Sequence, residues 1–119
     1  MNQKIIPLIG IFLLLASFSC GYQIKFYHPD LNKEDITMFV SNLNQSNLLE
    51  GIKVIKVYKC LNTYWDGRYL AGPGIIEIDA CHYYEGQLYH ELKHHFCYRT
   101  EKYWGHEGCF TKTIGLGEY

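Results

Sequence analysis

Residues 90–94, His-Glu-Leu-Lys-His, carry two imidazoles four positions apart with a carboxylate between them. On an α-helix, residues four apart lie on one face, about one turn from each other. Two imidazoles placed in this way can bind one Zn²⁺ through Zn–N bonds of about 2.0–2.1 Å. Glu91 lies beside the metal, where it can take a proton from a zinc-bound water. The motif therefore predicts a hydrolytic zinc site with His90 and His94 as ligands and Glu91 as the base.

A catalytic zinc site normally has a third protein ligand. His106 is the favoured candidate because Gly105, just before it, can end the helix and let the chain turn back. Glu107 is the alternative third ligand. Glu101 shares the helical face of His94 but lies about 10 Å beyond it along the axis, which is too far.

The helix that carries the motif is expected to start near Gln87 and to stop by Gly105. A rotation of 100° per residue places the motif on one side, facing a cleft. His95 points about 100° away from His94 and is expected to be a surface or packing residue. The apolar sector on the opposite side packs on the core and contains Leu88, Tyr89, Leu92, Phe96 and Tyr103.

The elements before this helix are predicted from hydrophobic periodicity. Strands are expected over residues 22–27, 52–58 and 75–79, with a loop over residues 60–74. A second helix is expected after Asn32 or Asp30 as N-cap, with an apolar stripe at Ile36, Phe39, Val40 and Leu43. The tail after Gly105 is expected to be irregular. This order of elements predicts one small α+β domain over residues 20–119.

The five cysteines favour an exported protein. If Cys20 is set aside, four remain, which suggests two disulfides with three possible connectivities. A cysteine zinc site is disfavoured because the sequence contains no C-x-x-C. We predict Cys97–Cys109, which would draw the His106 loop toward the metal face, and therefore Cys60–Cys81.

The first 19 residues have the layout of a secretory signal peptide. A lysine precedes an apolar run of 14 residues, and small residues follow it. Such a run is short for a membrane-anchor helix, which is the competing interpretation. Cys20 is then either the first mature residue or, as in a bacterial lipobox, a lipidated one, although the expected Leu is replaced by Ser17. We therefore predict a secreted or cell-envelope protein, anchored to a membrane through lipid if Cys20 is modified.

Composition excludes several other functions. The formal net charge is -1, so no basic field attracts nucleic acid. Neither of the common glycine-rich phosphate loops occurs, which disfavours nucleotide chemistry.

The stretch H-E-L-K-H, preceded by I-I-E-I-D and followed by W-G-H-E-G-C-F, resembles the zincin metallopeptidases. The resemblance covers about a third of the chain. It implies that His90 and His94 bind zinc and that Glu91 is the general base. It also implies that the strand before the helix, with Ile75, Ile76, Glu77 and Ile78, binds an extended peptide substrate.

The chain departs from the metzincin branch of that family. Cys97 and Thr100 stand where that branch has Gly and its third His, and no methionine follows the motif. The sequence thus predicts a minimal zincin-like domain acting as an exported zinc-dependent hydrolase of peptide or protein substrates. The alternative is a disulfide-stapled binding module or surface lipoprotein without catalysis.

Overall fold

The computed structural model describes residues 21–61 and 66–112. The predicted signal peptide and Cys20 lie outside the described residues. Within the described part, no helix is both long and apolar enough to cross a membrane. The elements along the chain are β1 (Gln23–Phe26), α2 (Lys33–Asn44), β2 (Val54–Tyr58), β3 (Gly67–Leu70), β4 (Ile75–Asp79), α3 (Tyr84–Glu101) and α4 (Cys109–Lys112).

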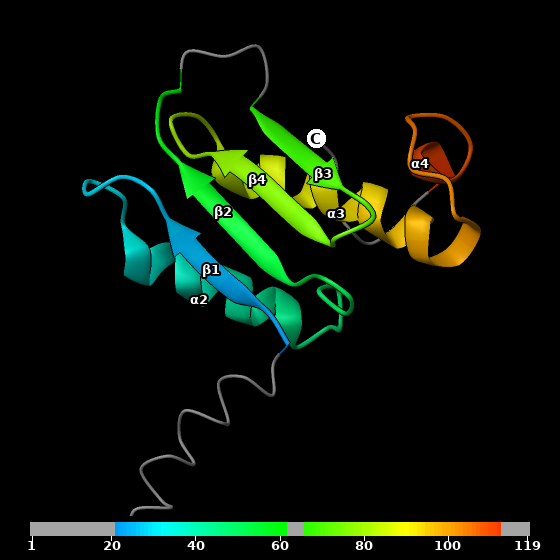
Figure 1. The fold of residues 1–119 in the computed structure, drawn as a ribbon, viewed down its shortest axis with the longest axis horizontal. Coiled ribbons are helices and arrows are strands. Elements are labelled where there is room, and N and C mark those ends of the chain that lie inside the picture. Colours follow the sequence, from blue (N-terminus) through cyan, green and yellow to red (C-terminus); the bar gives the residue numbers. More distant parts are fainter. Residues whose placement is uncertain (1–20, 62–65, 113–119) are drawn as a thin grey trace, which may run out of the picture.

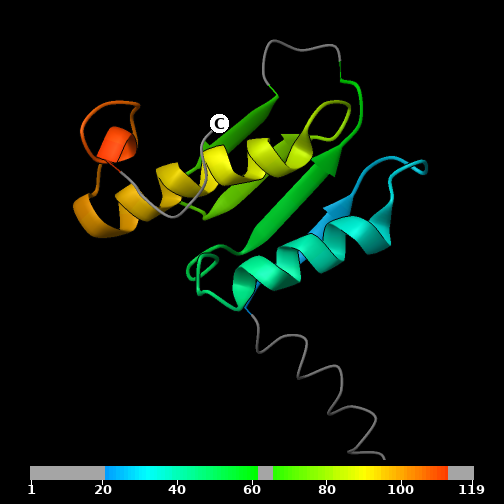
Figure 2. The same ribbon diagram turned by 180° about the vertical axis from the view of Figure 1, so that it is seen from behind.

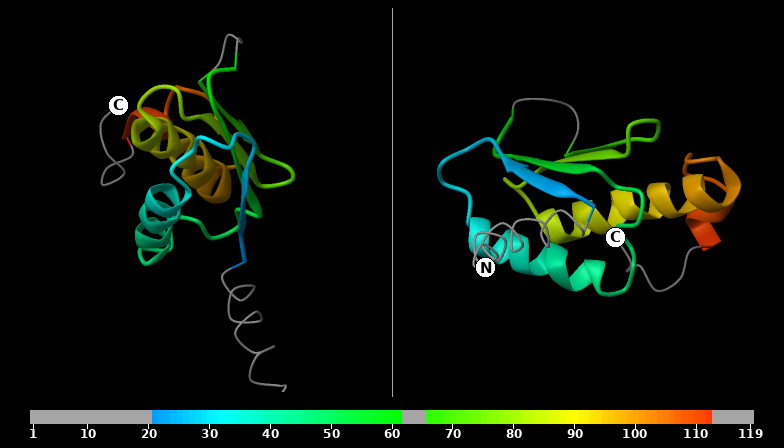
Figure 3. Two further views of the ribbon diagram at one scale, coloured as in Figure 1. Left: turned by 90° about the vertical axis from the view of Figure 1, so that its left-hand side faces the viewer. Right: turned by 60° about the horizontal axis from the view of Figure 1, so that its bottom comes forward.

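The four described strands form one mixed sheet in the order β1-β2-β4-β3. Strands β1, β2 and β4 are parallel, whereas β3 runs antiparallel to β4. Helices α2 and α3 both cover the same face of this sheet, α2 beside β1 and α3 behind β3 and β4 (Figures 1 and 2). The edge-on view in Figure 3 shows both helices on one side of the strands. The predicted α+β class is confirmed.

The core lies between the sheet and the two helices. Strand residues alternate between the two faces, so that every second side chain of β2 and β4 points toward the helices. Helix α2 adds its apolar stripe, and its predicted cap is confirmed: the Asn32 side chain accepts a hydrogen bond of 3.0 Å from the Asp35 amide. The fully buried side chains include Ile36, Val40, Ile55, Val57, Ile76, Ile78, Leu88 and Leu92.

The sequence prediction missed strand β3, which lies inside the expected loop. Its antiparallel pairing with β4 makes β3 an edge strand and β4 an interior strand. The prediction that Ile75–Asp79 binds an extended peptide is therefore wrong. Both backbone edges of β4 are already hydrogen-bonded, and the side chains of Ile76, Glu77 and Ile78 are buried.

Helix α3 begins three residues earlier than expected and ends at Glu101. The chain reverses at Lys102, which has left-handed backbone angles (φ 59°, ψ 25°) and donates its amide to the Tyr98 carbonyl. The helix therefore stops before Gly105, as expected, although Lys102 rather than Gly105 reverses the chain. Phe96 and Tyr103, expected in the apolar sector, are exposed, and Tyr103 lies beyond the end of the helix.

Both predicted disulfides are present. Cys60–Cys81 has a Cα–Cα distance of 4.7 Å, and Cys97–Cys109 has one of 5.8 Å. The first joins the end of β2 to the residues before α3. The second joins α3 to α4, a short helix in the tail expected to be irregular. Two disulfides in a chain this short suggest an oxidising, extracellular setting.

Candidate metal centre

Three histidines converge near the C-terminal half of α3. His90 and His94 come from successive turns of the helix, and His106 comes from the loop that follows it. One ring nitrogen of each lies within 4.8 Å of the others, and the Nε2 atoms of His90 and His106 are 3.2 Å apart. This group could hold a metal ion. Glu107, the alternative third ligand, is exposed and is not part of it.

The loop over residues 102–108 brings His106 back along the helix. Lys102 reverses the chain, and the Cys97–Cys109 disulfide ties the far end of the loop to α3. Figure 1 shows this loop curling back beside the end of α3, with α4 next to it. The third histidine thus depends on a long-range covalent link as well as on the local turn.

His90 and His94 of this group have lowered pKa values, which favours the neutral form that metal binding requires. Burial lowers the pKa of His94 to about 4, with further lowering by His90 and His106 and a smaller opposing effect from a hydrogen bond to the Trp104 backbone. Burial, then His106 and Lys93, also lowers the pKa of His90. The Nδ1 atom of His94 is buried and has no hydrogen-bond partner among the described residues. Such an unpaired nitrogen is costly unless a further partner is bound.

Phe110 of α4 lies against all three imidazoles. Its ring centre is 5.0 Å from that of His90, 4.6 Å from that of His94 and 5.0 Å from that of His106. The Lys93 ammonium lies 5.0 Å from the same ring centre. The sequence prediction missed this residue, because nothing in the sequence relates Phe110 to His90 or His94.

Glu91 lies between the histidines and the sheet and is only 5% exposed. Burial raises its pKa to about 7. A cation bound by the nearby imidazoles would stabilise the carboxylate and lower that pKa again. Gly67 of β3 leaves room for the carboxylate, since a Cβ there would lie 2.9 Å from Glu91 Oε2.

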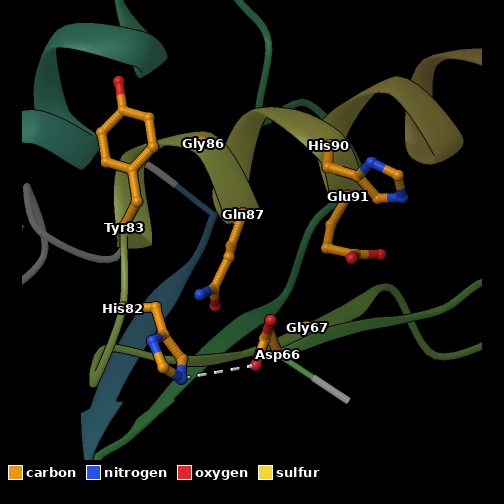
Figure 4. Close-up of a pocket in the computed structure, with 8 residues that line it drawn as sticks. All are labelled: Asp66, Gly67, His82, Tyr83, Gly86, Gln87, His90 and Glu91. Carbon is orange, nitrogen blue, oxygen red and sulfur yellow. Dashed lines mark ion pairs between the residues drawn. The ribbon is translucent and has the colours of Figure 1, made fainter. Parts of the chain in front are cut away.

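Two pockets meet at Glu91. One of about 430 Å³ lies between β3 and the first half of α3. Figure 4 shows Gln87 and Glu91 reaching from α3 toward Gly67, with Asp66 and His82 opposite. The other, of about 540 Å³, is lined by Glu91, His94 and His106, by Tyr69 of β3, and by Tyr103, Trp104 and Gly105 of the loop.

Tyr69 and His95 form a separate contact behind the second pocket. The Tyr69 hydroxyl lies 2.6 Å from His95 Nδ1, and burial raises the Tyr69 pKa to about 12. His95 Nε2 lies 2.6 Å from the Glu50 carbonyl. His95 is thus a packing residue, one of the two roles expected for it. The sequence carries no signal for Tyr69, which lies within the expected loop over residues 60–74.

The donor set of the centre consists of imidazoles, which suit zinc, copper, nickel and iron better than magnesium or calcium. Three imidazoles with a carboxylate beside them also match the ligand number of catalytic zinc sites. No family model, curated protein or solved structure matches this chain.

Proposed function

We propose that the chain is a zinc-dependent hydrolase of peptide or protein substrates that acts outside the cytoplasm. The observation that carries this proposal is the placement of Glu91, a buried carboxylate, in the same pocket as His94 and His106. A carboxylate used only in packing would normally be paired by hydrogen bonds or charges. Here burial alone accounts for its raised pKa.

Zinc held by His90, His94 and His106 would lower the pKa of water to about 7 and polarise the substrate carbonyl. Glu91 would accept the proton that the attacking water loses. As the C–O bond forms and the C–N bond breaks, the same carboxyl group would deliver this proton to the leaving amine. A cation bound by the histidines would favour the carboxylate form of Glu91, which is the form that accepts a proton.

The substrate would lie along β3 rather than β4. Strand β3 is one of the two edge strands of the described sheet, and its Gly67 and Tyr69 border the two pockets that meet at Glu91. An extended peptide can pair with such an edge through main-chain hydrogen bonds. This proposal replaces the peptide site first expected on residues 75–79.

A second candidate is a metal site without catalysis. The contact of Phe110 with all three imidazoles favours this candidate. A metal covered by that ring would not be accessible to substrate and would serve only to link the segment after α3 to the helix. In that case the chain would be a disulfide-stapled binding module, and Glu91 would have no chemical role.

The Glu91→Gln variant separates the two candidates. We expect it to keep one zinc per chain and to lose about 10²- to 10⁴-fold in kcat on a library of quenched fluorescent peptides, since a base is lost and no ligand is removed. Glu101→Gln, an exposed glutamate on the same helix, is the matched control and should leave kcat unchanged. Equal activity of wild type and Glu91→Gln, or loss of zinc from the variant, would overturn the proposed role.

A further inference from the structure

Four rings around the candidate metal position form a nearly regular tetrahedron. The ring centres of His90, His94 and His106 lie 4.6–5.2 Å from one another. The Phe110 centre lies 4.6–5.0 Å from each of them. Four aromatic rings at nearly equal mutual distances enclose one central point.

The size of this tetrahedron fits a metal ion bound by the three imidazoles. With edges of about 5 Å, its centre lies about 3 Å from each ring centre. A Zn–N bond of about 2.0–2.1 Å and the roughly 1 Å from a ring nitrogen to its ring centre give the same distance. The close approach of the His90 and His106 Nε2 atoms shows that these two rings point their nitrogens inward.

We infer that Phe110 occupies the position of the fourth zinc ligand, so that its ring covers the metal and must move before substrate can bind. A catalytic zinc site keeps this fourth position for water or substrate, whereas a closed site fills it. A phenyl ring cannot coordinate the metal, so the position is covered without being ligated. The inference rests on the proposed function, and Phe110 would be the residue that controls access.

The surroundings of Phe110 support a cover rather than a core residue. The ring is partly exposed and does not belong to the hydrophobic core of the described residues. Its contacts join it to the three imidazoles and to the Lys93 ammonium. No polar bond of the side chain would have to break for the ring to turn away.

Of the two residues before Phe110, Cys109 is held by a disulfide and Gly108 has free space beside it in the described structure. Cys109 is bonded to Cys97 on α3, so the start of α4 stays beside the histidines. Gly108 has φ +64°, and among the described residues nothing lies within 4 Å of where its Cβ would be. Rotation of the Phe110 side chain would open the fourth position while the disulfide holds Cys109 beside α3.

The test uses the full-length protein loaded with Co²⁺, whose visible spectrum reports the coordination of the metal. Acetohydroxamate, a small ligand for an open metal position, is titrated into wild type, Phe110→Ala and Phe110→Leu. We expect Phe110→Ala to bind it at least tenfold more tightly than wild type, with Phe110→Leu between them. Phe96→Ala removes an exposed ring from α3, the helix that carries His90 and His94, and should behave as wild type.

The outcomes separate this inference from the proposed function. If wild type and both Phe110 variants hold one Co²⁺ and bind acetohydroxamate equally, the inference is overturned and the metal site stands. Loss of Co²⁺ from both variants also overturns it, because the ring would then support the ligands rather than cover the metal. Failure of wild type to bind Co²⁺ would contradict the proposed function itself.

Discussion

His94 and His95 follow each other on α3 and are 7% and 3% exposed, yet their ring nitrogens have different surroundings. His95 faces the sheet, where Nδ1 is bonded to the Tyr69 hydroxyl and Nε2 to the Glu50 carbonyl. His94 faces the His106 loop, and its buried Nδ1 is unpaired among the described residues. Burial is therefore common to the packing histidine and the candidate metal ligand. What distinguishes them is that both nitrogens of His95 have partners in the fold, whereas Nδ1 of His94 has none among the described residues.

The same contrast separates the two sides of α3. Toward the sheet, His95 has both ring nitrogens bonded. Toward the loop, the imidazoles of His90, His94 and His106 lie together, and the buried Glu91 carboxylate shares a pocket with two of them. A cation bound by these three rings would give their nitrogens a common partner, whereas protonation would bring like charges together.

The largest expected effect comes from comparing two variants that carry the same substitution, one at His94 and the other at His95. His94→Gln should weaken zinc binding by more than about 100-fold, since loss of a partner outside the ligand set already costs 10–100-fold. His95→Gln should keep zinc and lose about 1–3 kcal/mol in the free energy of unfolding, because buried partners are left unpaired. Zinc titration against a competing chelator and urea unfolding measure the two effects. Similar zinc affinities for the two variants would contradict the distinction.

The two disulfides offer the next comparison. Cys97→Ser with Cys109→Ser should lower stability by about 3 kcal/mol and weaken zinc binding about tenfold, because the His106 loop is released. Cys60→Ser with Cys81→Ser should lower stability by a comparable amount and leave zinc affinity unchanged, since that bond lies at the other end of α3. Zinc titration of both double variants is the measurement. Equal losses of affinity would show that the effect is general destabilisation.

Gly67→Ala tests the sheet side of the site with a smaller change. The added Cβ meets Glu91 Oε2 at 2.9 Å and must displace the carboxylate. We expect kcat to fall about tenfold with zinc content unchanged, since small misplacements of a reacting group are costly. Gly72→Ala is the control, because no described atom lies within 4 Å of its Cβ position. A fall of the same size in Gly72→Ala would remove the argument for Gly67.

The pH dependence of the metal-free protein should show the smallest effect. The raised pKa of Glu91, about 7, makes a stabilising contribution that is present below its ordinary value of 4.5 and is lost as pH rises through 7. The lowered pKa of His94, about 4, makes a stabilising contribution that is present above pH 6.5, its ordinary pKa, and is lost as pH falls through 4. Between pH 4.5 and 6.5, the contribution of Glu91 makes stability fall as pH rises, whereas that of His94 makes it increase. Removal of the carboxyl group in Glu91→Gln should therefore make stability rise more steeply with pH across this window, as urea unfolding at several pH values would show. Parallel profiles for variant and wild type would contradict these assignments.

Much of the framework could be predicted from local patterns. The apolar stripe of α2, its Asn32 cap, and strands β1, β2 and β4 follow from periodicity and from residue types with clear preferences. Strand β3 escaped prediction because its four residues begin with Gly67 and are followed closely by Gly72, Pro73 and Gly74, so that only its pairing with β4 marks it as a strand. The four-residue helix α4 likewise depends on its disulfide.

The residues of the candidate site also fall into two groups, those that local sequence relates and those that only the fold brings together. His90, Glu91 and His94 are close in sequence, so helical geometry alone relates them. His106 could be predicted because a chain reversal and a disulfide both bring it back toward the helix. Gly67, Tyr69 and Phe110 reach the site through contacts between distant elements, for which the sequence carries no local signal.

The most direct test of the account is the metal content of the purified wild-type protein, measured by native mass spectrometry and by elemental analysis. We expect one zinc ion per chain, lost on treatment with a strong chelator and regained when zinc is added back. Protein that contains no transition metal and binds none in the presence of excess zinc would contradict the claim that His90, His94 and His106 form a metal centre.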